Sequence, residues 1–285
     1  MNKARALKGS GHRFKAVLTP LARLLLLVGL AFFLLQLYFV ARIALMNVLP
    51  PESTAFQRSE ALRVVRSTGA LKWRQDWVPY SQMSVHLKRA VIASEDASFT
   101  EHDGVDLEAL EKAWEKNAQA EQRAQKLAER QAAQAAARKP AKLAANAVPG
   151  ATPAAARPAV KPPKIVGGST ITQQLAKNLF LSGERTLLRK GEELVLTLML
   201  ESLLSKQRIL EIYLNHVEWG EGVFGAEAAA QHYFHKSATR LSPYEAARLA
   251  VMLPRPRYFE TRPNSGYLAS RANTIVARMG SVEVP

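Results

Sequence analysis

The stretch of sequence that most constrains the fold reads AVIASEDASFTEH and covers residues 90–102. In it, an apolar run with helical spacing leads into two adjacent carboxylates, those of Glu95 and Asp96. On a helix, Glu95, Phe99 and His102 would share one face, because they stand at helical spacing. A carboxylate at the end of a buried helix is costly unless another group pairs with it or the protein uses it. Taken alone, this stretch favours a salt bridge over a catalytic acid.

Size and composition narrow the classes of protein that the chain can be. Its 285 residues suffice for one large domain or two small ones, and a hydrophobic content of 48% supports a real core. The net charge of +15 indicates an anionic partner, such as nucleic acid, an anionic membrane surface or a phosphorylated substrate. Because neither zinc-finger spacing nor a glycine–aromatic strand signature occurs, we expect no nucleic-acid partner. The lack of cysteine excludes disulfides, thiolate chemistry and zinc sites with cysteine ligands.

The N-terminal segment has the pattern of a membrane anchor. Residues 1–23 are basic and contain no acid, and the apolar segment that follows covers residues 24–46, interrupted only by Arg42. A helix needs about 20 such residues to cross a bilayer core. The basic flank predicts a single span with the N-terminus in the cytoplasm and the rest of the chain outside. A cleaved signal peptide is the alternative, but its apolar run would be only about 7–15 residues, and Arg42 spoils the candidate cleavage site.

Composition divides the chain into five parts. After the basic tail at 1–23 and the anchor at 24–46, we expect one ordered domain in two pieces, residues 47–110 and 165–285. Between them lies an insertion, residues 111–164. A helical pattern runs from Leu107 to about Leu127, residues 121–137 can be helical but have no apolar face to bury, and residues 138–164 are mainly alanine, proline and lysine. Because this composition cannot bury enough apolar surface for a core, it predicts a disordered or polyproline-like spacer. Weak electrostatic contact with a membrane or a polyanion is the alternative.

Helix start and stop signals dominate the ordered pieces. Ser84 can cap a helix that runs from about Val85 to Ser98, and Thr170–Gln173 and Ser242–Glu245 each fit a capping box. Further helices are expected in residues 187–204, in a segment whose apolar face carries Ile209, Leu210, Tyr213, Leu214 and Val217, in an alanine-rich segment ending near Phe234, and in residues 267–279. The predicted fold class is therefore mainly α, a helical domain on a transmembrane helix.

The helix that starts at Thr170 carries a polar row, which is either a solvent face or a binding face. This row consists of Thr170, Gln174, Lys177 and Asn178. Gly167 and Gly168 before the helix leave backbone N–H groups accessible at a helix N-terminus, which is a natural seat for an anion. Lys177, Arg185 and Arg189 add cations, and an arginine can bind phosphate through two parallel hydrogen bonds. The pattern predicts a phosphate or pyrophosphate site.

Two separated acids complete the candidate chemistry. Glu193 lies one helical turn after Arg189, so the two form either a plain ion pair or part of the anion site. Glu95 and Glu193 together indicate acid–base chemistry on a sugar, because glycosyl chemistry commonly uses two carboxylates with unequal roles. For His232 and His235 we expect a surface role, since no third metal ligand is evident. The Ser-x-x-Lys and Lys-Thr-Gly motifs of penicilloyl-type acyl transfer are absent.

Four long motifs follow one another along the chain. They read EDASFTEHDG at residues 95–104, GGSTITQQLAKNLF at 167–180, RKGEE at 189–193 with Leu200 and Glu201 beyond it, and SKQRILEIYLN at 205–215. In this order they resemble the signatures of the peptidoglycan glycosyltransferases. Because the chain ends without room for a transpeptidase domain, it resembles the monofunctional biosynthetic peptidoglycan transglycosylases. The long insertion between the first two motifs departs from the family, in which this connection is usually much shorter.

The resemblance implies a lysozyme-like helical domain with a small membrane-proximal jaw. It implies polymerisation of lipid II, an undecaprenyl-pyrophosphate-linked disaccharide-pentapeptide, with inversion and release of the lipid pyrophosphate. Glu95 would be the general base on the 4-hydroxyl of the acceptor sugar, the growing glycan strand would be the donor, and Glu193 would help to hold the pyrophosphate. The resemblance also implies that the pyrophosphate is neutralised by Lys177, Arg185 and Arg189. Sugar and phosphate would be positioned by Ser169, Thr170, Gln174 and Asn178. The surroundings of the base would be shaped by Asp96, Phe99 and His102.

The same resemblance sets the expected cofactors and partners. No organic cofactor is expected, and a divalent cation, Mg²⁺ or Mn²⁺, is expected only at Glu193. The implied location is the inner membrane of a bacterium, with a periplasmic catalytic domain and with division or elongation proteins as candidate partners. Two other functions stay open: a lytic enzyme that cleaves glycan on the same fold, and a membrane-tethered scaffold without enzymatic activity. The lytic function would leave the cluster of cations unexplained.

Overall fold

The computed structural model describes residues 7–137, 168–181 and 186–285, so Gly167 and Arg185 of the predicted anion site lie outside these ranges. Contacts divide the chain into two compact units. The first joins Met1–Gly104 to Thr170–Pro285, and the second is Val105–Ser169. The described residues are mainly helical, which confirms the predicted fold class. The expected boundaries of the insertion stay a prediction.

The first helix, α1 (Leu7–Leu45), contains the predicted anchor. Its part Pro20–Leu45 has a mean hydropathy of 2.5 and is the one helix, among the residues that the structure describes, that is long and apolar enough to cross a membrane. From Pro20 onward most of its side chains are exposed, but Phe39 packs against the core of the first unit and Ile43 is fully buried in it. The apolar helix therefore ends inside the packing of the first unit.

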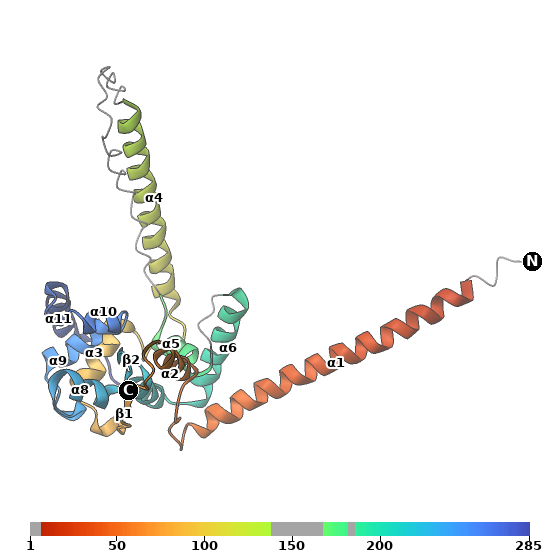
Figure 1. Cartoon of the computed structure of the whole chain (residues 1–285), viewed down its shortest axis with the longest axis horizontal. Helices are drawn as coiled ribbons and strands as arrows, with labels where there is room; N and C mark the ends of the chain where they lie inside the picture. The colour runs from red at the N-terminus through yellow and green to blue at the C-terminus, as the bar shows by residue number, and fades with distance from the viewer. Residues whose placement is uncertain (1–6, 138–167, 182–185) are drawn as a thin grey trace, which may run out of the picture. The chain divides into compact units, whose positions relative to one another are not determined.

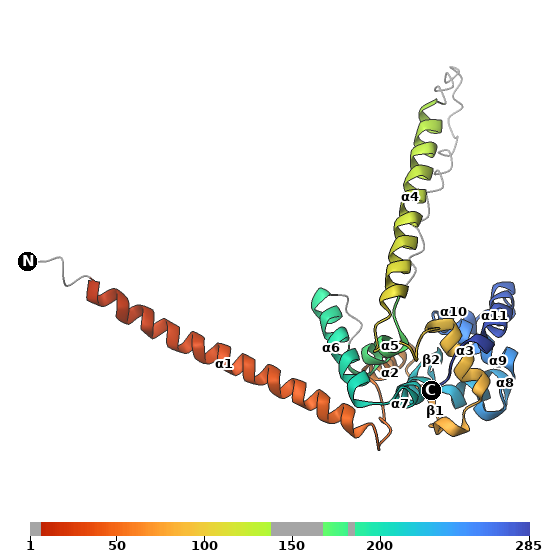
Figure 2. The same cartoon turned by 180° about the vertical axis from the view of Figure 1, so that it is seen from behind.

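The other helices of the first unit form two neighbouring groups. They are α2 (Ala55–Thr68), α3 (Val85–Glu95), α5 (Ile171–Phe180), α6 (Leu187–Leu203), α7 (Lys206–His216), α8 (Ala226–Phe234), α9 (Pro243–Met252), α10 (Pro256–Glu260) and α11 (Gly266–Arg278), with short 3₁₀ turns η1 (Tyr80–Gln82), η2 (Ala238–Arg240) and η3 (Met279–Ser281). In one group α3 packs on α9, and α9 packs on α11; in the other, α5 packs on α2, α6 and α7 (Figure 1 and, from behind, Figure 2). One hydrophobic core runs through both groups.

A small sheet lies beside these helices. Its strands are β1 (Arg74–Gln75), β2 (Glu218–Gly220) and β3 (Val223–Phe224), in the order β1-β3-β2. Strand β1 runs parallel to β3, and β2 runs antiparallel to β3 with an irregular register. The sheet ties the segment after α2 to the end of α7.

The starts of α5 and α9 follow the predicted capping boxes. Thr170 caps α5 with Gln173 in a complete capping box, and Ser242 does the same for α9, with Pro243 in the first helical turn. Ser205, for which the sequence analysis predicted no cap, caps α7 through a hydrogen bond from the N–H of Arg208 to its hydroxyl oxygen. In each case the signal is local, because cap and partner lie three residues apart in the chain.

The end of α3 is a correction to the sequence analysis. This helix ends at Glu95, not at Ser98, because Asp96 leaves the helical region with φ −163° and ψ 77°. The carboxylate of Asp96 is bound instead by α5 and by His102. The prediction that Glu95, Phe99 and His102 share one helix face is therefore wrong. All three nevertheless lie close to the place where the end of α3 meets the start of α5, which we call the junction.

The second unit contains α4 (Leu107–Ala137), which continues beyond the predicted end near Leu127. Its side chains are mostly exposed, and they include Trp114 and Leu107 near its start. Glu108 and Lys112 form an ion pair one turn apart on its surface.

Candidate active site

Glu95 is the last residue of α3, and buried neighbours hold it in place. Ala90, Val91 and Ile92 of the same helix are fully buried in the core, so the end of the helix has little freedom to move. The side chain of Glu95 itself is half-buried. Gln174 Nε2 of α5 donates a hydrogen bond of 3.0 Å to Glu95 Oε2, and Ser94 Oγ lies 3.4 Å from Glu95 Oε1.

Its surroundings tune the acidity of Glu95. Burial raises the pKa of Glu95 above its ordinary value of 4.5, and the charge of Asp96 adds to this effect. Hydrogen bonds from Gln174 and Ser94 and the positive charge of Lys177 oppose the rise in pKa, because they favour the ionised form. A carboxylate with a raised pKa is a better proton acceptor, in its ionised form, than an ordinary carboxylate.

The side-chain amide of Gln174 is itself fixed by a second hydrogen bond, on its oxygen. Tyr213 of α7 donates its hydroxyl hydrogen to Gln174 Oε1 across 2.9 Å, and the tyrosine side chain is fully buried. The sequence analysis placed Tyr213 on an apolar face and missed its hydroxyl group. The signal was present, because a buried tyrosine hydroxyl normally needs a hydrogen-bond partner. Tyr213 therefore belongs to the surroundings of Glu95, although the sequence analysis gave this position of the fourth motif no role.

Asp96 joins the first two motifs directly. Its Oδ2 accepts the backbone N–H of Ile171 at 2.9 Å, and its Oδ1 lies 2.8 Å from Nε2 of His102. Because the N–H of Gly104 donates to His102 Nδ1 at 3.1 Å, the neutral imidazole carries its hydrogen on Nε2 and donates it to Asp96. The protein's own carboxylate thus occupies the N-terminus of α5, where the sequence analysis expected a seat for a substrate anion.

The hydroxyl group of Thr170 is also used in hydrogen bonds within the protein. Its hydroxyl accepts the N–H of Gln173 at 3.2 Å and donates to the carbonyl oxygen of Gly104 at 2.6 Å, and the residue is buried. Gly104 has φ +84°, and a Cβ there would lie 2.7 Å from Cγ2 of Thr197. Only glycine fits this turn without a shift of its neighbours. Thr170 and Gly104 therefore lock the loop after His102 against the start of α5.

Phe99 and His102 form the floor of this junction. Phe99 is fully buried, and its ring meets that of His102 edge-on, with 6.5 Å between centroids. Lys206 Nζ lies 4.7 Å from the centroid of the Phe99 ring, donates to the carbonyl oxygen of His102 and pairs with Glu201 Oε1 at 2.8 Å. Lys206 and Glu201 both stand in the quoted motifs, but sequence reasoning assigned no role to either residue.

A second cluster of charges lies on α6. The carboxylate of Glu193 is buried, forms an ion pair with Lys190, and lies 3.9 Å from Nη1 of Arg189. Arg189 Nε is buried and has no hydrogen-bond partner among the residues that the structure describes. The cluster thus carries one negative and two positive charges, together with an unused donor. This arrangement is compatible with both predicted interpretations, an ion pair on one helix and an anion site.

The structure brings some predicted site residues together and leaves others apart. Glu95, Asp96 and Gln174 meet at one junction, and Lys177 of α5 is close enough for its charge to lower the pKa of Glu95. Over the described ranges, no hydrogen bond or ion pair links Glu193 to Glu95. Asn178 is half-buried on α5, Ser169 is exposed in the second unit, and Arg185 lies outside the described residues.

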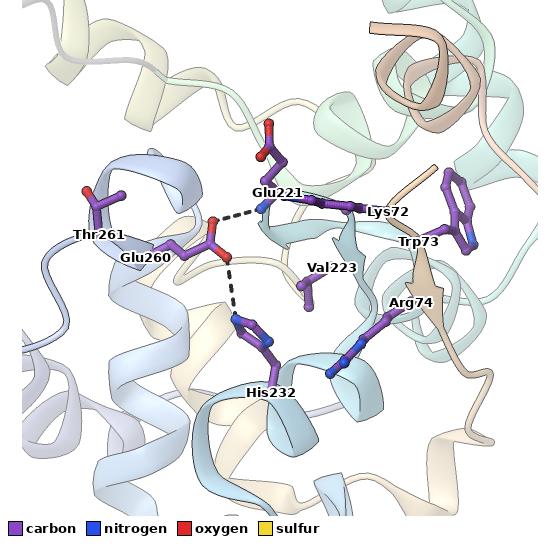
Figure 3. A pocket seen from close by; sticks show the side chains of 9 residues that line it. Lys72, Trp73, Arg74, Glu221, Val223, His232, Glu260 and Thr261 are labelled. Carbon is purple, nitrogen blue, oxygen red and sulfur yellow. Dashed lines mark hydrogen bonds and ion pairs between the residues drawn. The ribbon is translucent and has the colours of Figure 1, made fainter. Parts of the chain in front are cut away.

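A cavity of about 510 Å³ opens elsewhere on the first unit (Figure 3). It is lined by Lys72, Trp73, Arg74, Glu221, Gly222, Val223, His232, Glu260 and Thr261. Glu260 crosses it, accepting the N–H of Glu221 at 2.9 Å and lying 3.4 Å from Nε2 of His232. The lining contains none of the predicted site residues, so this cavity is separate from the junction around Glu95.

Comparison with known proteins shows which family this chain resembles. A family model described as Transglycosylase matches residues 63–126 and 148–280 of this chain. The biosynthetic peptidoglycan transglycosylase of Burkholderia thailandensis is 48% identical over 250 residues, covering 88% of this chain and 82% of that protein. That of Herminiimonas arsenicoxydans is 45% identical over 262 residues, covering 92% and 96%. The family match includes all four motifs and every described residue of the junction around Glu95.

Proposed function

This chain belongs to the biosynthetic peptidoglycan transglycosylases, and on that basis we propose that it polymerises lipid II into glycan strands with Glu95 as the general base. Membership makes it a peptidoglycan glycosyltransferase of cell-wall synthesis. One observation carries the finer assignment: the carboxylate of Glu95 is half-buried, has a raised pKa and is oriented by Gln174 from a second motif. These are the properties of a positioned base and not of an ion-paired surface acid.

In the proposed reaction, Glu95 takes the proton of the 4-hydroxyl group of the acceptor sugar. The hydroxyl oxygen attacks the anomeric carbon of the donor, which is the growing strand, from the face opposite the pyrophosphate. The bond from the anomeric carbon to the pyrophosphate oxygen breaks, and its electron pair leaves on that oxygen. A single displacement of this kind inverts the configuration at the anomeric carbon.

The departing lipid pyrophosphate needs positive charge. Arg189 and Lys190 on α6 supply it in this proposal, together with Lys177 and Arg185. Two features support the assignment to α6: Arg189 Nε has no partner among the described residues, and Lys190 stays largely exposed, with 57% of its side chain accessible. Glu193 holds both cations in place beside the ligand. Gln174, Asn178 and Ser169 are proposed to contact sugar or phosphate, whereas the hydroxyl group of Thr170 is already used in the cap of α5.

A divalent cation, Mg²⁺ or Mn²⁺, is proposed only for the substrate-bound state. Both oxygens of Glu193 face cations, Lys190 and Arg189, and no group of three or more acidic or histidine ligands surrounds Glu193 in the described ranges. These residues therefore do not fit a resident cation. A cation shared between one carboxylate and substrate phosphate is a common arrangement for Mg²⁺. We expect a chelator to leave the thermal midpoint of the substrate-free protein unchanged.

The proposed location follows from the substrate. Because the lipid tail of lipid II stays in the bilayer, an enzyme anchored beside it meets its substrate in two dimensions. The apolar helix Pro20–Leu45 supports an anchor in the inner membrane. The basic residues before it support a cytoplasmic N-terminus and a periplasmic catalytic domain. Division or elongation proteins remain proposed partners.

Incubation of the purified full-length protein with lipid II in detergent or vesicles tests this function. We expect polymerised glycan that a muramidase can digest, together with released undecaprenyl pyrophosphate. Shortened fragments from preformed peptidoglycan, without any polymer, would instead establish a lytic enzyme. If neither polymer nor fragments form while the protein stays folded and bound to membranes, the scaffold function is correct.

A further inference from the structure

We propose that Tyr213 is a positioning residue of this site, which sets the orientation of the Gln174 amide so that its nitrogen faces Glu95. This inference rests on the proposed function of Glu95 as a general base. The geometry that carries it is a chain of two hydrogen bonds across three helices, from Tyr213 on α7 through Gln174 on α5 to Glu95 on α3. The two distances are 2.9 Å and 3.0 Å.

The amide of Gln174 has two possible orientations, because its oxygen and nitrogen can exchange places by rotation. With the nitrogen toward Glu95, the amide donates to the carboxylate. With the oxygen toward Glu95, two acceptors face each other, and the carboxylate loses a donor. The amide alone does not decide between the two orientations when the proton on Glu95 is exchanging during the reaction, since a protonated carboxyl can donate to the amide oxygen.

Tyr213 removes this freedom. Its side chain is fully buried, and Gln174 Oε1 is the acceptor of its hydroxyl hydrogen. If the amide turned over, this hydroxyl hydrogen would face an amide NH₂ and would lose its acceptor inside the core. An unsatisfied buried donor is costly, so Tyr213 keeps the amide nitrogen on the side of Glu95 whether or not Glu95 is protonated. Burial and the nearby charges of Glu95 and Asp96 raise the pKa of Tyr213 well above 10.0, so its hydroxyl stays a donor at any working pH.

The expected effect on pH dependence follows from the groups that face Glu95. These are Ser94 and Asp96 on its own segment and Gln174 and Lys177 on α5, with Tyr213 of α7 behind Gln174. The hydrogen bond from Gln174 lowers the pKa of Glu95, because it stabilises the carboxylate. If Gln174 loses its orientation, the pKa of Glu95 rises further. The basic form is then lost at a higher pH on acidification, so the acid limb of the activity profile moves to higher pH.

The test is the pH profile of kcat/KM for lipid II polymerisation by the full-length variant Tyr213→Phe. We expect a fall of roughly tenfold at pH values on the acid limb, partial recovery at high pH, and an acid limb displaced to higher pH. Tyr233→Phe is the control: its hydroxyl also donates to an oxygen, the carbonyl of Trp219 at 2.7 Å, and the side chain is partly buried where that of Tyr213 is fully buried. Tyr233 has no hydrogen bond to Glu95 or Gln174 among the described residues. That control should keep the profile of the unmodified enzyme.

A double-mutant cycle separates positioning from general packing. In a Gln174→Met background, Tyr213→Phe should cause little further change, because its action passes through the glutamine. Gln174→Met alone should displace the acid limb in the same direction, which tests the inference even if Tyr213→Phe proves unstable. An unchanged profile for Tyr213→Phe, or an equal loss in both backgrounds, overturns it. Glu95→Gln measured in parallel separates the two proposals: activity in that variant refutes the base assignment itself, whereas its inactivity beside an unshifted Tyr213→Phe refutes only the role of Tyr213.

Discussion

Two charged clusters of the first unit are held in different ways. The base cluster consists of Glu95, Asp96, Gln174 and Tyr213, and its hydrogen bonds join residues 79, 75 and 39 positions apart in the chain. The pyrophosphate cluster consists of Arg189, Lys190 and Glu193, and its ion pairs join residues three or four positions apart on one helix. The base cluster forms only when residues from different helices pack together, whereas the pyrophosphate cluster forms between neighbouring residues of a single helix.

The difference suggests a division of labour. Groups in the base cluster have partners on other helices, so they are oriented before substrate arrives and need little rearrangement during proton transfer. The pyrophosphate cluster keeps an excess of positive charge and a buried arginine donor without a partner among the described residues. It is suited to a ligand that brings negative charge and is released again. The predictions below test this contrast, from the largest expected effect to the smallest.

Replacing the base should have the largest effect. Glu95→Gln keeps the shape and a hydrogen-bonding partner for Gln174 but removes the proton acceptor, so kcat should fall by roughly 10³-fold. The measurement is lipid II polymerisation, with membrane insertion and thermal midpoint as checks on folding. The matched control is Glu101→Gln, which changes an exposed carboxylate in the same motif. Unchanged polymerisation by Glu95→Gln would falsify the assignment of the base.

Removing a cation from the pyrophosphate cluster should have an intermediate effect on activity and a small one on stability. Arg189→Ala should lower kcat/KM by about 10- to 100-fold, because one or two charge-assisted hydrogen bonds to the leaving group are lost. Its thermal midpoint should change little, since its ion pair with Glu193 is long at 3.9 Å. Arg271→Ala removes an exposed arginine of α11 and serves as the control for net charge. Equal activity of the two variants would count against a pyrophosphate role for Arg189.

Stability should respond more strongly to a change in the base cluster than to a change in the pyrophosphate cluster. Asp96→Asn should lower the free energy of unfolding by about 1–3 kcal/mol, because the asparagine can accept from Ile171 but its NH₂ group then faces the N–H of His102. Glu193→Gln should cost about 1 kcal/mol or less, since its partner Lys190 is largely exposed to solvent. Chemical denaturation of both variants measures the difference. Equal losses would show that the long-range contacts of Asp96 are not the stronger ones.

Deleting residues 122–163 should have the smallest effect. Both clusters lie in the first unit, and the deleted residues belong to the second. We expect kcat/KM to stay within about twofold of the unmodified enzyme, because connecting segments outside the hydrophobic core tolerate deletions. A collapse of lipid II polymerisation in a folded, membrane-bound deletion variant would reject the spacer interpretation of this segment.

Local features of this molecule could be read from its sequence. The caps at Thr170, Ser205 and Ser242 depend on residues three positions away, so the sequence alone determines them. The long apolar helix near the N-terminus is similarly local, because its length and apolar composition are visible in the sequence. Family motifs added the candidate base and cations.

What only the tertiary structure decided is which distant residues meet. It ended α3 at Glu95, because Asp96 finds better partners at the N-terminus of α5 than in another helical turn. It filled the expected anion seat with that same carboxylate, and it turned the hydroxyl group of Tyr213 toward Gln174. Helical periodicity cannot predict such pairs, because it reports which face of a helix is buried but not which side chain of another helix lies opposite. The candidate base was therefore visible in the sequence, whereas the network that orients it appeared only when α3, α5 and α7 packed together.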